Sequence, residues 1–152
     1  MNYIGEHLWA AELGRGLTAF SFAFALLSAV AYYQKGAQWK TLGRLAFRLH
    51  ATALFGLIGT LFFIMANHYF EFDYVRKHTS LDLAPRYLFS AFWEGQEGSF
   101  LLWMFWNAIL GWILTYSAKS FEGPVVGVFA AVQAFLVSMI LGVYIGDLHI
   151  GY

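Results

Sequence analysis

The stretch that decides the fold is residues 49–70, LHATALFGLIGTLFFIMANHYF, which contains no Asp, Glu, Lys or Arg. Its length exceeds the roughly 20 residues that a helix needs to cross the hydrocarbon core of a bilayer. Working outward from it, three further charge-free stretches lie at 16–34, 99–118 and 124–146. We therefore predict four transmembrane helices at about these positions.

The composition also favours a membrane protein over a soluble domain. Apolar residues make up 60% of the chain and charged residues 12%, against about half and a quarter in soluble proteins. Backbone groups in hydrocarbon must be satisfied within each span, so the predicted fold class is an all-α integral membrane protein, with residues 1–152 as one membrane domain. Equal numbers of basic and acidic residues give no attraction for nucleic acid, which is not an expected partner. The absence of cysteine excludes disulfides and thiolate ligands.

The distribution of basic residues predicts the orientation. The segment 35–48 holds Lys35, Lys40, Arg44 and Arg48 and no acid, whereas the longer segment 71–98 holds three basic residues. Basic residues mark the cytoplasmic side. We therefore predict a multi-pass protein of the cytoplasmic (inner) membrane, with both termini external, the 71–98 loop on the periplasmic side, and membrane lipid as a partner.

The external loop ends in the segment 93–103, WEGQEGSFLLW, which contains the candidate site. Gly95 and Gly98 permit a tight turn or the close approach of a large group. Glu97 and Ser99 lie where the third span begins, where a carboxylate and a hydroxyl either cap the helix or contact a ligand. Their chemistry identifies no catalytic residue.

Two tryptophans, Trp93 and Trp103, bracket this segment. Trp103 and Trp106 share one helical face and form either an aromatic wall for a flat ligand or part of the interfacial aromatic belt. The candidate site residues are Trp93, Gly95, Glu97, Gly98, Ser99 and Trp103.

The histidines of the second span are the weaker candidates for a metal site. His50 and His68 are 18 residues apart, which places them on one helical face but about 27 Å apart along the axis. They cannot ligate one iron together, and no other charge-free stretch contains an opposing histidine. We predict no metal site and keep the two histidines as candidates because ionisable residues within membranes are often functional.

Several segments resemble the CcmF-type branch of the cytochrome c assembly (haem lyase) family. They are Tyr74-Val75, Ser80, Pro85-Arg86-Tyr87 and, above all, the segment 93–103. The resemblance covers the whole chain and corresponds to the amino-terminal portion of that family. Glu94 departs from the pattern, which has a small residue at this place.

The resemblance implies cytochrome c-type biogenesis: a membrane protein that presents haem to apocytochrome c on the outer face of the cytoplasmic membrane. It implies that the six candidate residues face haem or substrate, and that other cytochrome c maturation membrane proteins are partners. It also implies a tryptophan-rich segment and haem-ligating histidines further along the family chain.

This sequence contains no such tryptophan-rich segment. We therefore expect an N-terminal fragment of a longer multi-span protein that binds no stoichiometric haem by itself, and its status as an enzyme stays open. Two alternatives also stay open. One is the membrane anchor of a quinone or cytochrome b electron-transfer complex, although the missing histidine partners count against it. The other is a structural membrane subunit.

Overall fold

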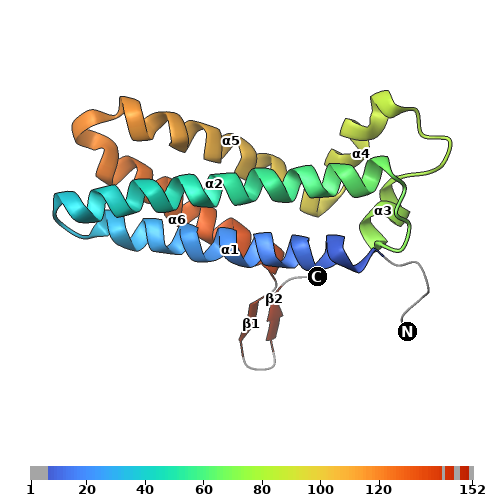
Figure 1. Ribbon diagram of the computed structural model, residues 1–152, viewed down its shortest axis with the longest axis horizontal. Helices are drawn as coiled ribbons and strands as arrows, with labels where there is room; N and C mark the ends of the chain where they lie inside the picture. The colour runs from blue at the N-terminus through green and yellow to red at the C-terminus, as the bar shows by residue number, and fades with distance from the viewer. Residues whose placement is uncertain (1–6, 142, 146–147, 151–152) are drawn as a thin grey trace.

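The computed structural model describes residues 7–141, 143–145 and 148–150. Within these ranges four helices are long and apolar enough to cross a membrane, as predicted. They are α1 (Leu8–Tyr33), α2 (Ala37–Ala66), α5 (Gln96–Ser117) and α6 (Glu122–Leu141). The chain is a helical bundle of the multi-pass membrane type (Figure 1).

Shorter elements fill the connections. The helix α3 (Asp73–His78), the 3-10 helix η1 (Pro85–Tyr87) and the helix α4 (Leu88–Glu94) link α2 to α5, and η2 (Lys119–Phe121) links α5 to α6. The strands β1 (Val143–Ile145) and β2 (Leu148–Ile150) form an antiparallel hairpin after α6. The all-α prediction is confirmed for the bundle. The β1–β2 hairpin was not predicted.

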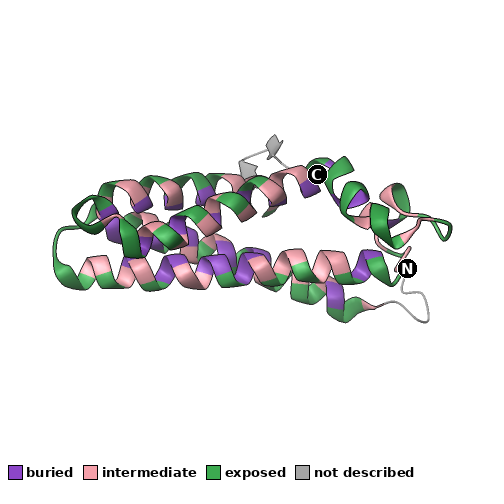
Figure 2. Cartoon of the chain, turned by 90° about the horizontal axis from the view of Figure 1, so that it is seen from above, coloured by how far each residue is buried: buried purple, intermediate pink, exposed green. Residues whose placement is uncertain are grey.

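The bundle has two ends with different structures (Figure 1). We call the end with α3 and α4 the loop end, residues 67–98 with the adjoining helix termini. We call the opposite end the turn end, residues 34–48 and 115–124. Helix α1 packs along both α2 and α6, while α5 packs against α6 and α2. Buried residues face neighbouring helices and exposed residues line the outer surfaces (Figure 2).

Each end has its own group of buried apolar side chains. The larger group serves the loop end and the middle of the bundle, and includes Leu54, Met65, Phe92 and Met104. The smaller group lies toward the turn end and consists of Tyr32, Phe47, Val126 and Ala130. The two ends are therefore stabilised by separate sets of contacts.

Two helices begin well before the charge-free stretches that predict them. Helix α1 starts at Leu8 rather than near residue 16, and α2 starts at Ala37 rather than near residue 49. The charge-free criterion detects the part of a helix in hydrocarbon, and a helix can continue into the interface with charged residues. Glu12 and Arg15, for example, form an exposed ion pair of 2.6 Å within α1.

The second and fourth helices end earlier than their predicted spans. Helix α2 ends at Ala66 instead of residue 70, because His68 takes a left-handed conformation with φ 54°. Its N–H donates to the carbonyl of Met65, and the N–H of Tyr69 donates to that of Ile64, which is the Schellman arrangement. Helix α6 ends at Leu141 instead of residue 146, since residues 143–145, Val-Tyr-Ile, form a strand and have high β-propensity.

Candidate functional site

The candidate segment 93–103 forms a sharp corner between α4 and α5 at the loop end. Gly95 separates the two helices with an extended backbone, φ −76° and ψ 152°. The hydroxyl of Tyr74, from α3, donates a hydrogen bond of 2.6 Å to the carbonyl of Phe92. This bond joins the loop to the corner and brings together residues 18 positions apart in the sequence.

The two glycines of the segment accommodate Tyr74. A Cβ at Gly95 would stand 2.5 Å from the Tyr74 hydroxyl oxygen, and a Cβ at Gly98 would overlap the carbonyl of Phe92. The close approach expected at these glycines therefore occurs, but the large group within the described chain is Tyr74. The fold therefore requires a glycine at position 98, because a Cβ there would clash.

Neither Glu97 nor Ser99 caps α5 in the way expected. The N-cap residue is Gly95, and no side chain caps the helix. The Ser99 hydroxyl instead donates to the carbonyl of Trp93 at 3.0 Å, which closes the corner from the other side. Glu97 lies in the first turn of α5, where the helix dipole favours its negative charge.

The tryptophans of the segment face outward. Trp93 is 53% exposed, Trp103 is 60% exposed and Trp106 is 57% exposed. Such exposure is compatible with lipid contact and with an external ligand or partner, so the two interpretations of the Trp103 and Trp106 face remain. The structure separates these indole groups from the glycines, which point inward to Tyr74.

A cavity of about 290 Å³ lies next to this corner, between α1, α2, α5 and α6 and beneath α3. Its walls are mainly apolar, with Leu57, Ile64 and Leu101 among them, and Asp73, Tyr74 and Glu97 are among its polar lining residues. Burial, and then the charge of Glu97, raise the pKa of the Tyr74 hydroxyl to about 12. The phenol therefore stays protonated and able to donate its hydrogen bond at neutral pH.

Two acids of the loop end, Glu71 and Asp73, hold the loop itself through ion pairs. The ring of His7 stacks on Tyr69 at 3.7 Å, and its Nδ1 lies 2.6 Å from Oε1 of Glu71. Although desolvation acts in the opposite direction, the hydrogen bonds from His7 lower the pKa of the Glu71 carboxyl. Hydrogen bonds from Lys77 and Arg76 lower the pKa of Asp73. These pairs link the start of α1 to the loop and stabilise the short helix α3.

The prediction that His50 and His68 share one helical face is wrong. His68 lies beyond the end of α2, where it takes the left-handed conformation that terminates the helix. His50 is fully buried, and its Nδ1 lies 3.0 Å from the carbonyl oxygen and 2.9 Å from the hydroxyl of Ser21 on α1. A serine, not a second histidine, therefore faces this nitrogen.

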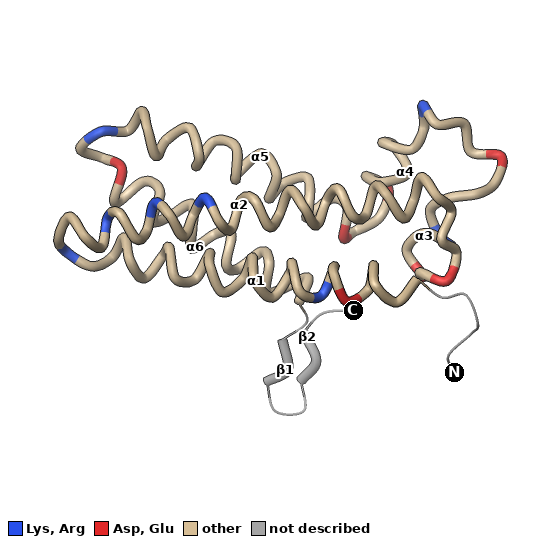
Figure 3. Tube along the Cα trace, viewed as in Figure 1, with Lys and Arg blue, Asp and Glu red and all other residues tan. Residues whose placement is uncertain are grey.

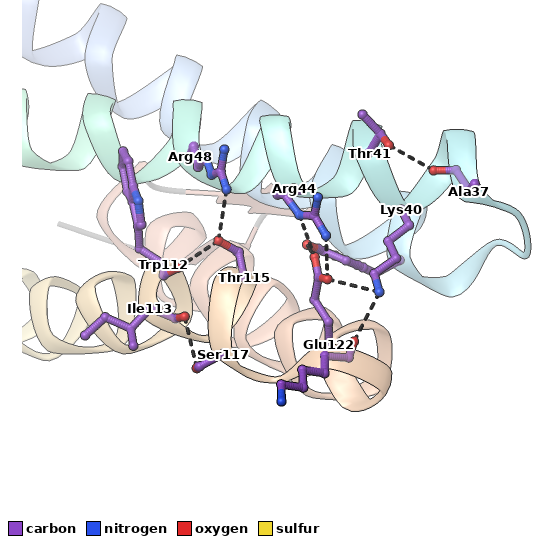
Figure 4. A network of polar contacts seen from close by, with 12 residues as sticks. Ala37, Lys40, Thr41, Arg44, Arg48, Trp112, Ile113, Thr115, Ser117 and Glu122 are labelled. Carbon is purple, nitrogen blue, oxygen red and sulfur yellow. Dashed lines mark hydrogen bonds and ion pairs between the residues drawn. The ribbon is translucent and has the colours of Figure 1, made fainter.

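The turn end contains a polar cluster that the sequence did not reveal, centred on Glu122 (Figure 4). The Glu122 side chain is 2% exposed. Arg44 donates to both carboxylate oxygens, at 2.9 and 2.6 Å, Tyr32 donates at 2.9 Å, and Lys40 lies at 3.0 Å. One carboxylate thus connects α1, α2 and α6.

The basic residues of this end outnumber its acid. Among the described residues of the turn end, five are basic and Glu122 is the one acid; most of these charges lie along the first turns of α2 (Figure 3). One sequence signal could have identified Glu122. It is a single acid immediately before a charge-free stretch, on the same predicted side of the membrane as a basic loop. The distance along the chain, 78 residues between Arg44 and Glu122, hid the pairing.

The two ends thus offer different chemistry. The loop end has an apolar cavity with two carboxylates and a phenol, and the turn end has a surplus of cations around a buried carboxylate. Comparisons with models of known protein families, with curated proteins and with solved structures found no match for this chain.

Proposed function

We propose that this chain is the amino-terminal membrane region of a haem lyase-type cytochrome c assembly protein. In this proposal the turn end faces the cytoplasm, and the loop end helps to present haem to apocytochrome c on the outer face of the inner membrane. The charge distribution supports the orientation, since the turn end has five basic residues and one acid, and residues 69–98 have five acids and three basic residues.

The observation that carries the proposal is that two of the segments behind the resemblance, Tyr74-Val75 and 93–103, pack together as one unit. Tyr74 bonds to the backbone at Phe92 and fills the space left by Gly95 and Gly98. Val75, from the same loop, is fully buried in the same apolar group as Phe92. The positions of Tyr74-Val75 and of the segment 93–103 therefore depend on each other. A shared role at one surface requires such a connection.

His50 does not fit an axial haem site. Nε2 of His50 is buried without a hydrogen-bond partner, but its side chain is fully enclosed, so a haem could reach it only by separating the helices. We therefore assign this chain a role in shaping the haem-handling surface, with axial ligands supplied elsewhere. The role falls to Trp93, Glu97 and Trp103, while Gly95, Gly98 and Ser99 form the corner that holds them.

The electron-transfer anchor is less well supported. An anchor that stacks two haems across the membrane requires an opposing histidine on another helix for each iron. Within the described helices Ser21 faces His50, and His68 lies outside α2.

The test uses substitutions that keep the corner intact, in the full-length protein. Trp93→Ala and Glu97→Gln remove an exposed indole and a negative charge without adding volume. We expect each to lower the yield of holocytochrome c about tenfold, measured by haem staining, with normal protein abundance by immunoblot.

Trp106→Ala is the matched control, because Trp106 is about as exposed as Trp93 and lies away from the corner, further along α5. We expect its yield to stay within about twofold of the unchanged protein if Trp106 contacts only lipid. A normal yield from both Trp93→Ala and Glu97→Gln would refute the proposed role of the loop end. Gly98→Val is unsuitable here, because the clash with Phe92 would disturb the fold itself.

A further inference from the structure

Two cavities at the turn end adjoin each other and differ in chemistry. One, of about 280 Å³, lies between α1 and α6, and the other, of about 260 Å³, lies between the start of α2 and the η2 connection. Both are lined by Tyr32, Gly123 and Pro124, so they adjoin at these residues, and we call the two together the groove. This groove lies at the opposite end of the bundle from the loop-end site and has no part in the proposed function.

The first half of the groove is apolar and lies among membrane-spanning residues. Ala29 of α1 and Val128 and Ala131 of α6 line it, and Val128 is 62% exposed. A Cβ at Gly123 would meet no atom within 4 Å, so the groove is open at this residue. From Gly123 to Ala131 the lining extends about 12 Å along α6, which suits part of a hydrocarbon chain.

The second half of the groove is polar and contains Lys40, with Gln34 and Ser120 beside it. Nζ of Lys40 lies 3.0 Å from Glu122 and donates to the carbonyl of Lys119 at 3.2 Å. An ammonium has three N–H donors, so one remains for a ligand in the groove. The Lys40 side chain is 40% exposed, which leaves it accessible from this side.

The charge of the turn end selects an anion. Glu122 is the one acid among the described residues here, and Arg44 already pairs with both of its oxygens. Lys40 therefore adds positive charge to a cluster whose carboxylate is neutralised. Lys35, Arg48 and Lys119 add further positive charge at the same end (Figure 3).

We propose that this groove binds an anionic phospholipid of the leaflet at the turn end. The phosphate accepts a hydrogen bond from Lys40 in the polar half, and the upper part of an acyl chain lies between α1 and α6 in the apolar half. A zwitterionic lipid carries a cation on its headgroup that the basic cluster repels. A free phosphate ester lacks the chain that the apolar half accommodates.

The test measures lipid binding to the detergent-purified chain by native mass spectrometry. The probes are phosphatidylglycerol, phosphatidylcholine with the same acyl chains, and glycerol 1-phosphate as the isolated headgroup. We expect phosphatidylglycerol to bind about fivefold more tightly than phosphatidylcholine, the effect of one lysine near an anionic headgroup, and glycerol 1-phosphate not to bind measurably. Equal binding of the two lipids would overturn the proposal, and so would binding of glycerol 1-phosphate as tight as that of the lipid.

Two substitutions test the charge and the space of the groove separately. Lys40→Gln should abolish the preference for phosphatidylglycerol and leave phosphatidylcholine binding unchanged. Gly123→Leu should fill the groove where its two halves meet and weaken binding of both lipids about tenfold, and its Cβ would meet no atom within 4 Å.

Each substitution has a matched control elsewhere in the chain. Lys77→Gln removes a lysine of the loop end, and Gly59→Leu adds the same side chain at a glycine of α2 that also has open space around it. Both controls should bind lipid like the unchanged protein. If Gly123→Leu binds phosphatidylglycerol as well as Gly59→Leu does, the groove is not the lipid site, whatever Lys40→Gln shows.

Discussion

The two ends of the bundle are closed by opposite means. At the turn end a buried carboxylate, Glu122, collects hydrogen bonds and ion pairs from α1 and α2. At the loop end an uncharged phenol, Tyr74, fills a space that exists because Gly95 and Gly98 have no side chains. The turn end should therefore be sensitive to changes of charge, and the loop end to changes of volume.

The largest effect should come from removing the charge of Glu122. Glu122→Gln leaves Arg44 and Lys40 without their counter-ion, and breaking a buried ion pair in this way costs about 3 kcal/mol. The free energy of unfolding, measured by denaturation in detergent micelles, should fall by that amount. Glu12→Gln, at an exposed pair in α1, should change it by less than about 0.5 kcal/mol. Equal effects at both positions would contradict the special role of the turn-end cluster.

A change of volume should be next in size. Gly98→Ala introduces a Cβ that overlaps the Phe92 carbonyl and the Tyr74 hydroxyl, and such overpacking costs about 2 kcal/mol. Gly16→Ala is the control, because a Cβ there meets no atom within 4 Å. In the interior of α1 it should stabilise the protein by roughly 0.5 to 1 kcal/mol. The two substitutions should therefore change the free energy of unfolding in opposite directions, and a change in the same direction would contradict the steric requirement at position 98.

A smaller effect should follow from loss of the Tyr74 hydroxyl alone. Tyr74→Phe keeps the ring between the glycines and removes one hydrogen bond to the backbone, which should lower the free energy of unfolding by about 1 kcal/mol. Tyr87→Phe, at a half-exposed ring, should have no measurable effect. A loss for Tyr74→Phe as large as that for Gly98→Ala would show that the hydrogen bond, and not the fit, closes the loop end.

The smallest effect should be a pH-dependent contribution of Glu71 to the stability of the loop end. Its pKa is lowered in the fold, so its stabilising contribution is complete above the unfolded value of 4.5 and is lost as the pH falls through the lower folded value. Amide hydrogen exchange at the start of α1 should be faster in Glu71→Gln than in the unchanged protein at about pH 6. The difference between the two should shrink as the pH falls through the lowered pKa of Glu71. A difference that persists in acid would exclude the carboxylate as its source.

The sequence predicted the four membrane helices because a bilayer imposes a length and an absence of charge that are readable locally. It did not predict where α1 and α2 begin, since the interface tolerates charged residues such as Arg15 and Lys40 within a helix. The early end of α2 depended on a left-handed conformation at His68, for which a histidine is not a recognisable signal.

The candidate site was predicted in part. A tight turn or a close approach at Gly95 and Gly98 was expected from their residue type, but the group that approaches them, Tyr74, could not be assigned without the fold. The capping expected of Ser99 failed because the helix begins three residues earlier, at Gln96. Glu122 was missed because all its side-chain partners lie on helices that precede it by 78 residues or more.

The order of residues around Glu122 has a consequence for biosynthesis. Arg44 and Lys40 belong to the second helix made, whereas their carboxylate arrives on the last described helix, 78 residues after Arg44. At synthesis rates of about 5 to 20 residues per second, Glu122 is synthesised about 4 to 16 s after Arg44. During that interval the long side chain can extend to the headgroup layer and keep its charge hydrated. Insertion of the fourth helix then draws the cations inward, so that the turn end closes only when all four helices are present.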